Sequence, residues 1–344
     1  MSPPVEALAA GRPLAAHGFS WRKRALVREF ASRGDIAFVS RGREVGGAST
    51  LLLWGSAAVP VGLPDDVTIV RMEDGFVRSV GLGADLTRPL SWVMDGTGIY
   101  YDASRPSALE NILAREQWTA EQLRRAAALR RRLVDAGLTK YNIAARPWRR
   151  PASGQRVVLV TGQVETDASI ATGTIDVRTN IELLREVRKA RPRAWVVYKP
   201  HPDVAAGLRA AGQGEGEAAR HCDEIADGSM NDLLAQVDEV HVMTSLAGFE
   251  ALLRGRQVAC YGMPFYAGWG LTDDRHANPR RTRRLSLDEL VAGALVDYPV
   301  YLSRVTRRRC TPEQAIDEIV EWRQRRPDGI PTWRKWLRPW LARP

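Results

Sequence analysis

The chain has 344 residues, of which 44% are hydrophobic, and it carries a formal net charge of +10 at pH 7. This length exceeds one ordinary hydrophobic core and predicts two domains of roughly 150 residues each, while the positive charge favours acidic partners: a nucleotide, an acidic sugar, an anionic membrane face or nucleic acid. Three cysteines that lie far apart argue against a disulfide framework or a structural zinc site.

The N-terminal residues show no basic start followed by a long apolar core, so we expect no signal peptide. The most apolar stretch, residues 51–63, is interrupted by Gly55, Pro60 and Gly62 and is too short to cross a membrane. Together with the sparse cysteines, these features predict a cytoplasmic protein.

The first half of the chain alternates strand-like and helical segments. Strands are predicted over 36–40, 50–54 and 67–72, and a long polar helix over 119–136 ends at Gly137 as a plausible C-cap. Residues 146–155, rich in Pro, Arg and small side chains, predict a linker.

The same alternation starts again after the linker. Strands are predicted over 157–161, 194–200, 239–244 and 257–262, and helices over 180–190, 230–237, 246–255, 286–295 and 312–325. This pattern is typical of an α/β protein with largely parallel sheets. We expect two nucleotide-fold-like domains with a cleft between them, over 1–150 and 151–305, followed by a helix and a basic tail over 306–344.

Two carboxylates, Glu165 and Asp167, follow the buried strand over 157–161. Ligands of α/β sheets bind at the carboxyl ends of the strands, so this position is a candidate site. Lys199 and His201 follow the next strand in the motif YKPHPDV, and two prolines stiffen their turn. Two cationic donors there suit a phosphate leaving group. The alternative is a turn with an exposed lysine and a structural histidine.

A third strand end carries Thr244 and Ser245, directly before a helix. Hydroxyl residues cap helices, and a helix N-terminus offers free N–H groups and positive potential to an anion. Glu250 lies on the same helix, within reach of a ribose hydroxyl. A simple N-cap with an exposed glutamate explains these residues equally well.

In the first half, Glu73 and Asp74 end the strand that begins near residue 67. They point to opposite sides of an extended chain, so we expect only one of them to enter a cleft easily, where it could act as a general acid or base. The alternative is an acidic turn that ends at Gly75. Residues 331–344 interleave tryptophans with basic residues, which suits either a membrane interface or a tail packed on the body of the protein.

Eight blocks of sequence, in order, resemble one family: bacterial capsule polysaccharide synthesis proteins of the KpsC/LipB type, which are retaining β-Kdo glycosyltransferases. The blocks are EDGFVRSVGLG, GIYYDASRPSALENIL, GLTKYN, GQVETDASI, VRTNIELL, YKPHPDV, TSLAGFEALLRG and YGMPFYAGWGLTDDR. Many members carry two transferase modules, and this single module looks more like the second. The resemblance implies a two-domain GT-B-like fold, with an acceptor-side N-terminal domain and a C-terminal domain that binds CMP-β-Kdo.

The resemblance also implies roles for single residues. Gln163, Lys199, His201, Thr244, Ser245 and Glu250 would bind the donor, with Glu250 on the ribose. Glu73, with Asp74 beside it, would act as acid or base across the cleft, and His201 would assist catalysis at the phosphate. Retention by double displacement needs a carboxylate nucleophile, which Asp167 matches, whereas Glu165 is expected to be a spectator.

Kdo carries a carboxylate on its anomeric carbon, and Arg78 and Arg178 are candidates to hold it. CMP would leave without a metal ion, and no other cofactor is expected. The expected acceptor is a Kdo-terminated glycolipid, which puts the protein at the inner membrane surface beside other capsule assembly proteins. Three alternatives remain: another CMP or CDP donor, with sialic acid or a polyol phosphate; a non-catalytic role in capsule export; and nucleic-acid binding, ranked last because no motif supports it.

Overall fold

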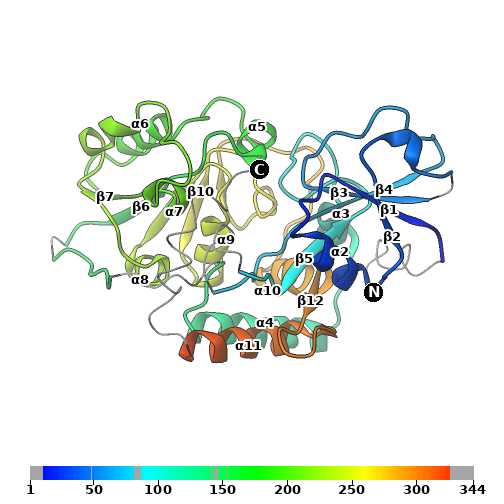
Figure 1. Cartoon of the computed structure of the whole chain (residues 1–344). Helices are drawn as coiled ribbons and strands as arrows, with labels where there is room; N and C mark the ends of the chain where they lie inside the picture. Colours follow the sequence, from blue (N-terminus) through cyan, green and yellow to red (C-terminus); the bar gives the residue numbers. More distant parts are fainter. Residues whose placement is uncertain are drawn as a thin grey trace.

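The computed structural model describes residues 11–47, 49–80, 87–140, 142, 146–152 and 154–325, which form two α/β units, each built on one sheet (Figure 1). The tryptophan-rich segment 331–344 lies outside these residues. Among the helices of the described ranges, none combines the length and apolar composition that a bilayer crossing requires.

The first sheet has seven strands in the order β13-β12-β5-β4-β3-β1-β2. Their bounds are β1 (Leu14–His17), β2 (Ile36–Phe38), β3 (Thr50–Trp54), β4 (Thr68–Asp74), β5 (Ser91–Asp95), β12 (Pro299–Leu302) and β13 (Arg309–Cys310). Strands β1 to β4 pair in parallel, whereas β5 is antiparallel to both β4 and β12. This sheet is therefore mixed rather than largely parallel.

The second sheet has six strands, all parallel, in the order β11-β10-β9-β6-β7-β8. They are β6 (Val157–Thr161), β7 (Trp195–Lys199), β8 (Glu224–Ile225), β9 (Glu239–Val242), β10 (Gln257–Cys260) and β11 (Asp273–Asp274). Every residue of the central strand β6 is buried, as expected for a parallel strand covered on both faces.

Several helices begin at residues whose side chains cap them. In the first unit the helices are α2 (Arg24–Ala31), η1 (Gly42–Glu44), α3 (Ala108–Arg115) and α4 (Ala120–Asp135). The second unit has α5 (Ala168–Gly173), α6 (Asn180–Ala190), α7 (Pro202–Ala205), η3 (Glu215–Arg220), α8 (Met230–Gln236) and α9 (Leu246–Leu253). Thr119 and Thr179 each form a capping box with the Gln or Glu three residues later, which fixes the starts of α4 and α6.

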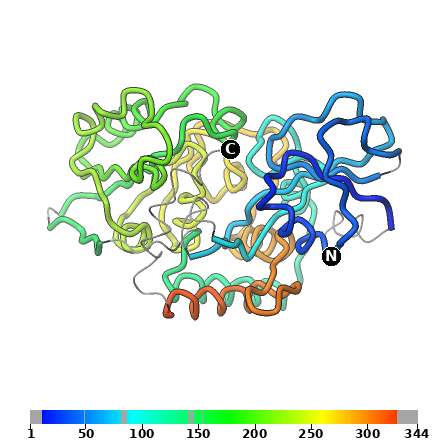
Figure 2. Tube along the Cα trace, in the orientation of Figure 1, coloured from blue at the N-terminus to red at the C-terminus, as the bar shows by residue number. Residues whose placement is uncertain are grey.

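The end of the described chain returns to the first unit. It forms α10 (Leu287–Val291), the π-helix η4 (Ala292–Asp297), strand β12 beside β5, and α11 (Pro312–Gln324), which lies along α4 (Figure 2). The predicted second domain, residues 151–305, differs from this arrangement, because β12 belongs to the first sheet. Strand β12 covers the edge of β5, whose backbone groups would otherwise be unpaired.

Buried contacts join the two units. The Phe76 ring stacks on Phe265 with 4.5 Å between ring centroids, and Phe249 packs against both. Glu110 of α3 accepts hydrogen bonds from Arg280 and Arg281 of the second half, so the units are tied at a shared core. This core fixes the relative position of the two sheets.

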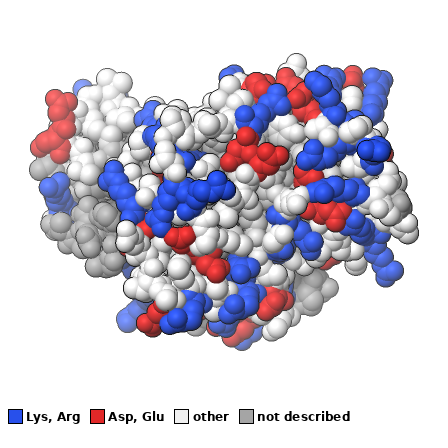
Figure 3. Space-filling model, turned by 180° about the vertical axis from the view of Figure 1, so that it is seen from behind, with Lys and Arg blue, Asp and Glu red and all other residues white. Residues whose placement is uncertain are grey.

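Basic side chains are spread over the back of the molecule and alternate with acidic ones, rather than gathering in one field (Figure 3). Many arginines form ion pairs, such as Arg150 with Asp238 and Arg188 with Asp223. Ion pairs therefore neutralise part of the basic side chains locally.

Candidate active site

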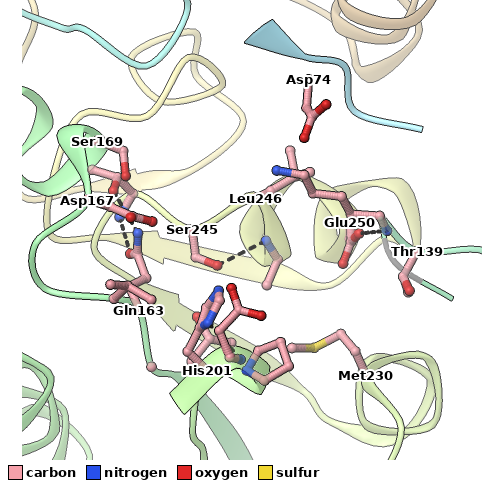
Figure 4. A pocket seen from close by; sticks show the side chains of 18 of the residues that line it. Asp74, Thr139, Gln163, Asp167, Ser169, His201, Met230, Ser245, Leu246 and Glu250 are labelled. Carbon is pink, nitrogen blue, oxygen red and sulfur yellow. Dashed lines mark hydrogen bonds between the residues drawn. The ribbon is translucent and has the colours of Figure 1, made fainter. Parts of the chain in front are cut away.

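A cavity of about 1370 Å³ lies between the two units and is lined by the ends of strands from both sheets. The first sheet contributes residues that follow β1, β3 and β4, and the second those that follow β6, β7 and β9. Figure 4 shows Asp74 on one wall, facing Asp167, His201 and Ser245 on the other. The structure therefore brings together the strand ends that the sequence marked separately.

The loop after β6 is fixed by an amide. The side chain of Gln163 accepts a hydrogen bond from the backbone N–H of Thr244 at 2.8 Å and donates to its Oγ1 at 2.9 Å. Asn180 holds the backbone of Gln163 by two further hydrogen bonds. Because Thr244 Oγ1 already accepts from Gln163, its own hydroxyl proton is available to an anionic ligand.

Gly162 leaves no room for a side chain at this turn. A Cβ there would lie 2.5 Å from the Tyr198 hydroxyl and 3.2 Å from the backbone nitrogen of His201. The glycine thus lets the ends of β6 and β7 approach each other beside the cavity.

The two acids after β6 have different environments. Asp167 lines the cavity at the N-cap of α5 without a side-chain capping bond. Burial raises the pKa of its carboxyl, against the opposing charges of His201 and Arg209. Glu165 is absent from the lining, since its carboxylate accepts the backbone N–H groups of Asn180 and Gln213. Glu165 therefore stabilises the neighbouring loops and lies outside the cavity lining.

Lys199 and His201 both line the cavity, as predicted. His201 caps α7, and its Nδ1 accepts the N–H of Asp203 at 3.2 Å, so in the neutral ring the proton sits on Nε2. Burial lowers the pKa of His201, although Asp203 and Asp167 oppose the shift. The His201 ring is thus a neutral N–H donor near pH 7. Burial also lowers the pKa of Lys199.

Thr244, Ser245 and Glu250 line the same wall at the start of α9. Ser245 caps this helix by accepting the N–H of Ala247 at 3.3 Å. Glu250 is buried, with 8% of its surface exposed, and one carboxylate oxygen accepts the N–H of Lys140 at 2.7 Å. Burial raises the pKa of Glu250, so this carboxylate is poorly solvated and suited to a sugar hydroxyl donor.

Glu73 reaches into the cavity across a glycine. A Cβ at Gly55 would lie 2.8 Å from Oε2 of Glu73 and 3.1 Å from the Tyr101 hydroxyl, and Gly55 has a φ of +53°. Burial, together with the neighbouring charge of Asp74, raises the pKa of Glu73 to about 7. A carboxyl with this pKa is poised to exchange a proton near neutral pH.

Asp74 has a different state from Glu73. Its carboxylate accepts from Arg78 at 2.6 Å and from the Trp92 indole at 3.1 Å. Burial would raise the pKa of Asp74, but the charges of Arg78 and Lys140 outweigh it and hold the pKa below its usual range. Asp74 is therefore an ionised neighbour of Glu73.

The expectation that only one of the two acids enters the cavity is wrong, because both line it. The Glu73 side chain bends toward the backbone of the next residue, where its Oε1 accepts the N–H of Asp74 at 2.9 Å. A longer side chain can thus reach the same side as its neighbour despite the alternation of the strand.

The two arginines expected to hold a sugar carboxylate are both outside the cavity lining. Arg78 is buried, with 6% of its surface exposed, and pairs with Asp74 and the Ser79 hydroxyl. Arg178 is exposed before α6 and donates to the carbonyl of Ile175. Arg78 positions an acid, and Arg178 stabilises a turn.

Two lysines near the cavity were missed by the sequence analysis. Lys140 lines the cavity, and its charge acts on Glu73, Asp74, Asp167, His201 and Glu250. Lys23 places its Nζ 3.1 Å from the centre of the Trp54 ring, and burial lowers its pKa to about 8 against the charges of Asp74 and Glu73. Lys140 lies in the block GLTKYN, which carries the family resemblance, whereas no motif in the sequence singles out Lys23.

Within the described ranges, no group of three or more His, Cys, Asp or Glu side chains is arranged to hold a metal ion. The cavity instead offers Lys, His and hydroxyl donors beside carboxylates from both units. Such a set can bind a phosphate, with one acid to act as a nucleophile and another to exchange a proton.

Comparison with known proteins identifies the family. Residues 59–146 and 120–309 match the capsule polysaccharide biosynthesis protein family. This chain belongs to that family. It is 41% identical over 314 residues to the capsule polysaccharide modification protein LipA of Neisseria meningitidis serogroup A, and 45% identical over 259 residues to the lipopolysaccharide-processing protein LpsZ of Rhizobium meliloti. These matches cover 88% and 73% of the chain but only 45% and 59% of the relatives, so the chain spans about half their length.

Two solved structures resemble this family member along most of its length. They are Thermosulfurimonas dismutans KpsC as a β-Kdo 2,7 transferase, with a TM-score of 0.77 and 40% identity, and as a β-Kdo 2,4 transferase, with a TM-score of 0.78 and 31% identity. Each match covers 91% of this chain and 99% or more of the other. The predicted KpsC/LipB-type membership and GT-B-like fold class are confirmed.

Proposed function

We propose that this chain is a retaining β-Kdo glycosyltransferase that moves Kdo from CMP-β-Kdo to a Kdo-terminated glycolipid in capsule synthesis. One observation carries the proposal: the cavity has Asp167 on the wall formed by one sheet and Glu73 on the wall formed by the other. Hydrogen-bond donors that suit a phosphate line the same wall as Asp167. The resemblance to two Kdo transferase structures over 91% of the chain supports it.

The chemistry follows from the two acids. A carboxylate oxygen of Asp167 attacks the anomeric carbon of Kdo, and the bond to the CMP phosphate breaks with inversion. Glu73 then takes the proton of the acceptor hydroxyl, whose oxygen displaces Asp167 with a second inversion. Two inversions give a β-linked product from a β-linked donor, and Asp167 is restored as a carboxylate.

Departure of CMP places negative charge on a phosphate monoester. Lys199, the Nε2–H of His201 and the Thr244 hydroxyl lie where they can stabilise that charge. Two of these donors are already oriented, since Gln163 holds Thr244 and the N-cap bond holds the His201 ring. Glu250 is suited to accept a ribose hydroxyl.

The position of the glycosidic linkage is proposed from the similarity to the two KpsC structures. Identity is higher to the 2,7 transferase than to the 2,4 transferase, at 40% against 31%. We therefore propose that the chain joins Kdo to O7 of the acceptor Kdo, an assignment that NMR of the product tests directly.

Lys140 is proposed to hold the Kdo carboxylate, because it lines the cavity, whereas Arg78 and Arg178 do not. Its charge also acts on acids of both walls. Replacing it in Lys140→Met should raise the KM for CMP-Kdo by about 10- to 100-fold, the value of a charged hydrogen bond. The affinity for free CMP, which lacks the sugar carboxylate, should fall much less. Isothermal titration with CMP and initial rates with CMP-Kdo separate the two effects.

The matched control is Arg178→Gln, which removes a cation outside the cavity and should leave both values unchanged. An equal loss of CMP and CMP-Kdo binding in Lys140→Met would show that Lys140 contacts the nucleotide instead.

The direct test of the proposed function is a transfer assay. Purified protein, CMP-Kdo made in situ and a soluble Kdo-terminated acceptor are incubated with a chelator, and mass spectrometry records the addition of Kdo. Addition of one Kdo, β-linked by NMR, supports the proposal. Transfer from CMP-sialic acid or a CDP-polyol instead would assign a different donor, and no transfer from any donor would favour a role in capsule export.

A further inference from the structure

Three exposed apolar side chains lie on two adjoining loops of the first unit. Six large hydrophobic side chains are exposed in the described part of the chain, and three of them are Trp21 at 74%, Val59 at 43% and Val61 at 95%. They lie on two loops that follow neighbouring parallel strands, residues 18–23 after β1 and residues 55–67 after β3.

The two loops touch each other at the rim of the cavity. A Cβ at Gly18 would lie 3.2 Å from the Cβ of Ala57, so the loops are in contact at these residues. Gly18, Ala57 and the intervening wall at Trp54 also line the cavity. The exposed side chains therefore stand only a few residues away from the acceptor-side wall.

The first loop and helix α2 are strongly basic. Residues 20–34 contain five basic residues and one acid, Glu29, which pairs with Arg88 and Arg307. Arg24 and Arg28 are exposed, lie one helical turn apart, and both pack on the Phe38 ring, at 4.8 and 4.9 Å. The outer face of α2 thus continues from Trp21 as a row of cations.

The second loop has cations beside its apolar tip. A Cβ at Gly42 would lie 2.6 Å from the carbonyl oxygen of Val61, so the exposed Arg41 and Arg43 flank this tip. Glu44 is occupied by the N–H groups of Ser40 and Arg41. Exposed Asp65 and Asp66 lie further along the loop, where Asp66 approaches Gly47.

We propose that these residues form a docking surface for an anionic phospholipid membrane. The rim surface consists of Trp21, Arg24, Arg28, Arg41, Arg43, Val59 and Val61. Exposed tryptophan and valine side chains enter the interfacial layer, while flanking arginines bind anionic headgroups. For acceptor delivery the inference rests on the proposed function: a glycolipid acceptor would enter the cavity from the bilayer beside it.

The turn before α2 separates the two tasks. Lys23 faces inward over Trp54, close enough to Glu73 and Asp74 for their charges to raise its pKa, while Trp21 is exposed on the outside. One short segment therefore carries an exposed residue of the proposed membrane surface and a lysine whose charge acts on Glu73 and Asp74.

The test uses the full chain and vesicles in a flotation assay, with phosphatidylcholine and phosphatidylglycerol in equal parts or phosphatidylcholine alone. Wild type should bind the anionic vesicles, and binding should weaken as salt rises. Arg24→Gln should lower the partition coefficient roughly five-fold, and Trp21→Ala on the order of ten-fold. The matched controls are Arg220→Gln and Val305→Ala, whose side chains are 74% and 72% exposed elsewhere and should bind like wild type.

Equal binding of wild type and the rim variants would overturn the proposal, as would equal binding to neutral vesicles or no binding at all. A soluble Kdo-terminated acceptor keeps this test apart from the proposed function. Rim variants should transfer to it at the wild-type rate, because they leave the cavity intact. If wild type itself fails with that acceptor, the proposed function fails while the vesicle result stands.

Discussion

Asp167→Asn should abolish Kdo transfer while leaving the fold intact. Loss of a covalent nucleophile costs on the order of 10⁴-fold in kcat. The structure predicts little loss of stability, because the Asp167 carboxylate makes no capping bond to α5. The measurements are the initial rate of transfer and the melting temperature of the variant. CMP binding, measured by titration, should persist because the residues proposed to donate hydrogen bonds to the phosphate lie on other loops.

Glu165 supplies the matched control two residues earlier. Its carboxylate accepts the N–H groups of Asn180 and Gln213, and a Cβ at Gly212 would lie only 2.3 Å from its Oε1. Glu165→Ala should therefore destabilise the protein by about 1–3 kcal/mol, the cost of leaving such groups unpaired, yet retain transfer at low temperature. If Asp167→Asn remained active while Glu165→Ala lost transfer without unfolding, the nucleophile would be assigned to the wrong acid.

Glu73→Gln should lower kcat by about 10²- to 10⁴-fold, since it removes the group that takes the acceptor proton. In wild type, the rate should rise as pH increases through about 7, where Glu73 loses its proton and becomes a base. This ascending limb should disappear in Glu73→Gln. A pH profile of kcat with the soluble acceptor measures both effects.

Removing neighbouring charges should shift the ascending limb of the pH profile of kcat, in a direction set by the sign of the charge removed. Lys23 lowers the pKa of Glu73, so Lys23→Met should shift the limb to higher pH. Asp74 raises the pKa of Glu73, so Asp74→Asn should shift the limb to lower pH, with a loss of stability because the buried Arg78 loses its ion pair with Asp74. Shifts of the same sign in both variants, or a limb that survives in Glu73→Gln, would assign the titration to another group.

Much of the fold follows from local sequence signals. Strands β3 and β6 and helix α6 have the predicted bounds, because each is an uninterrupted apolar run or a capped amphipathic segment. Strand β1 was missed, since Leu14–His17 contains two alanines and no β-branched residue. The return of β12 to the first sheet could not be read from the sequence, because no local signal states which edge a strand will join.

The site was predicted unevenly for a related reason. Asp167, His201 and Ser245 each lie within six residues after the end of a strand, so the rule for strand ends located them. Arg78 lies four residues from Asp74, a spacing that brings them together once the chain turns, and their ion pair removes Arg78 from the cavity. Lys140 follows no strand, and its place depends on how the two sheets face each other.

The return of the chain to its first sheet has a consequence for how the protein is made. Strand β5 pairs with β12, and Val93 lies opposite Pro299. The whole second unit lies between these two residues in the sequence. During synthesis, the ribosome must therefore deliver nearly all of the described chain before the first unit is complete. Until then the backbone groups on the outer edge of β5 are unpaired and can pair with strands of other chains, which is a route to aggregation.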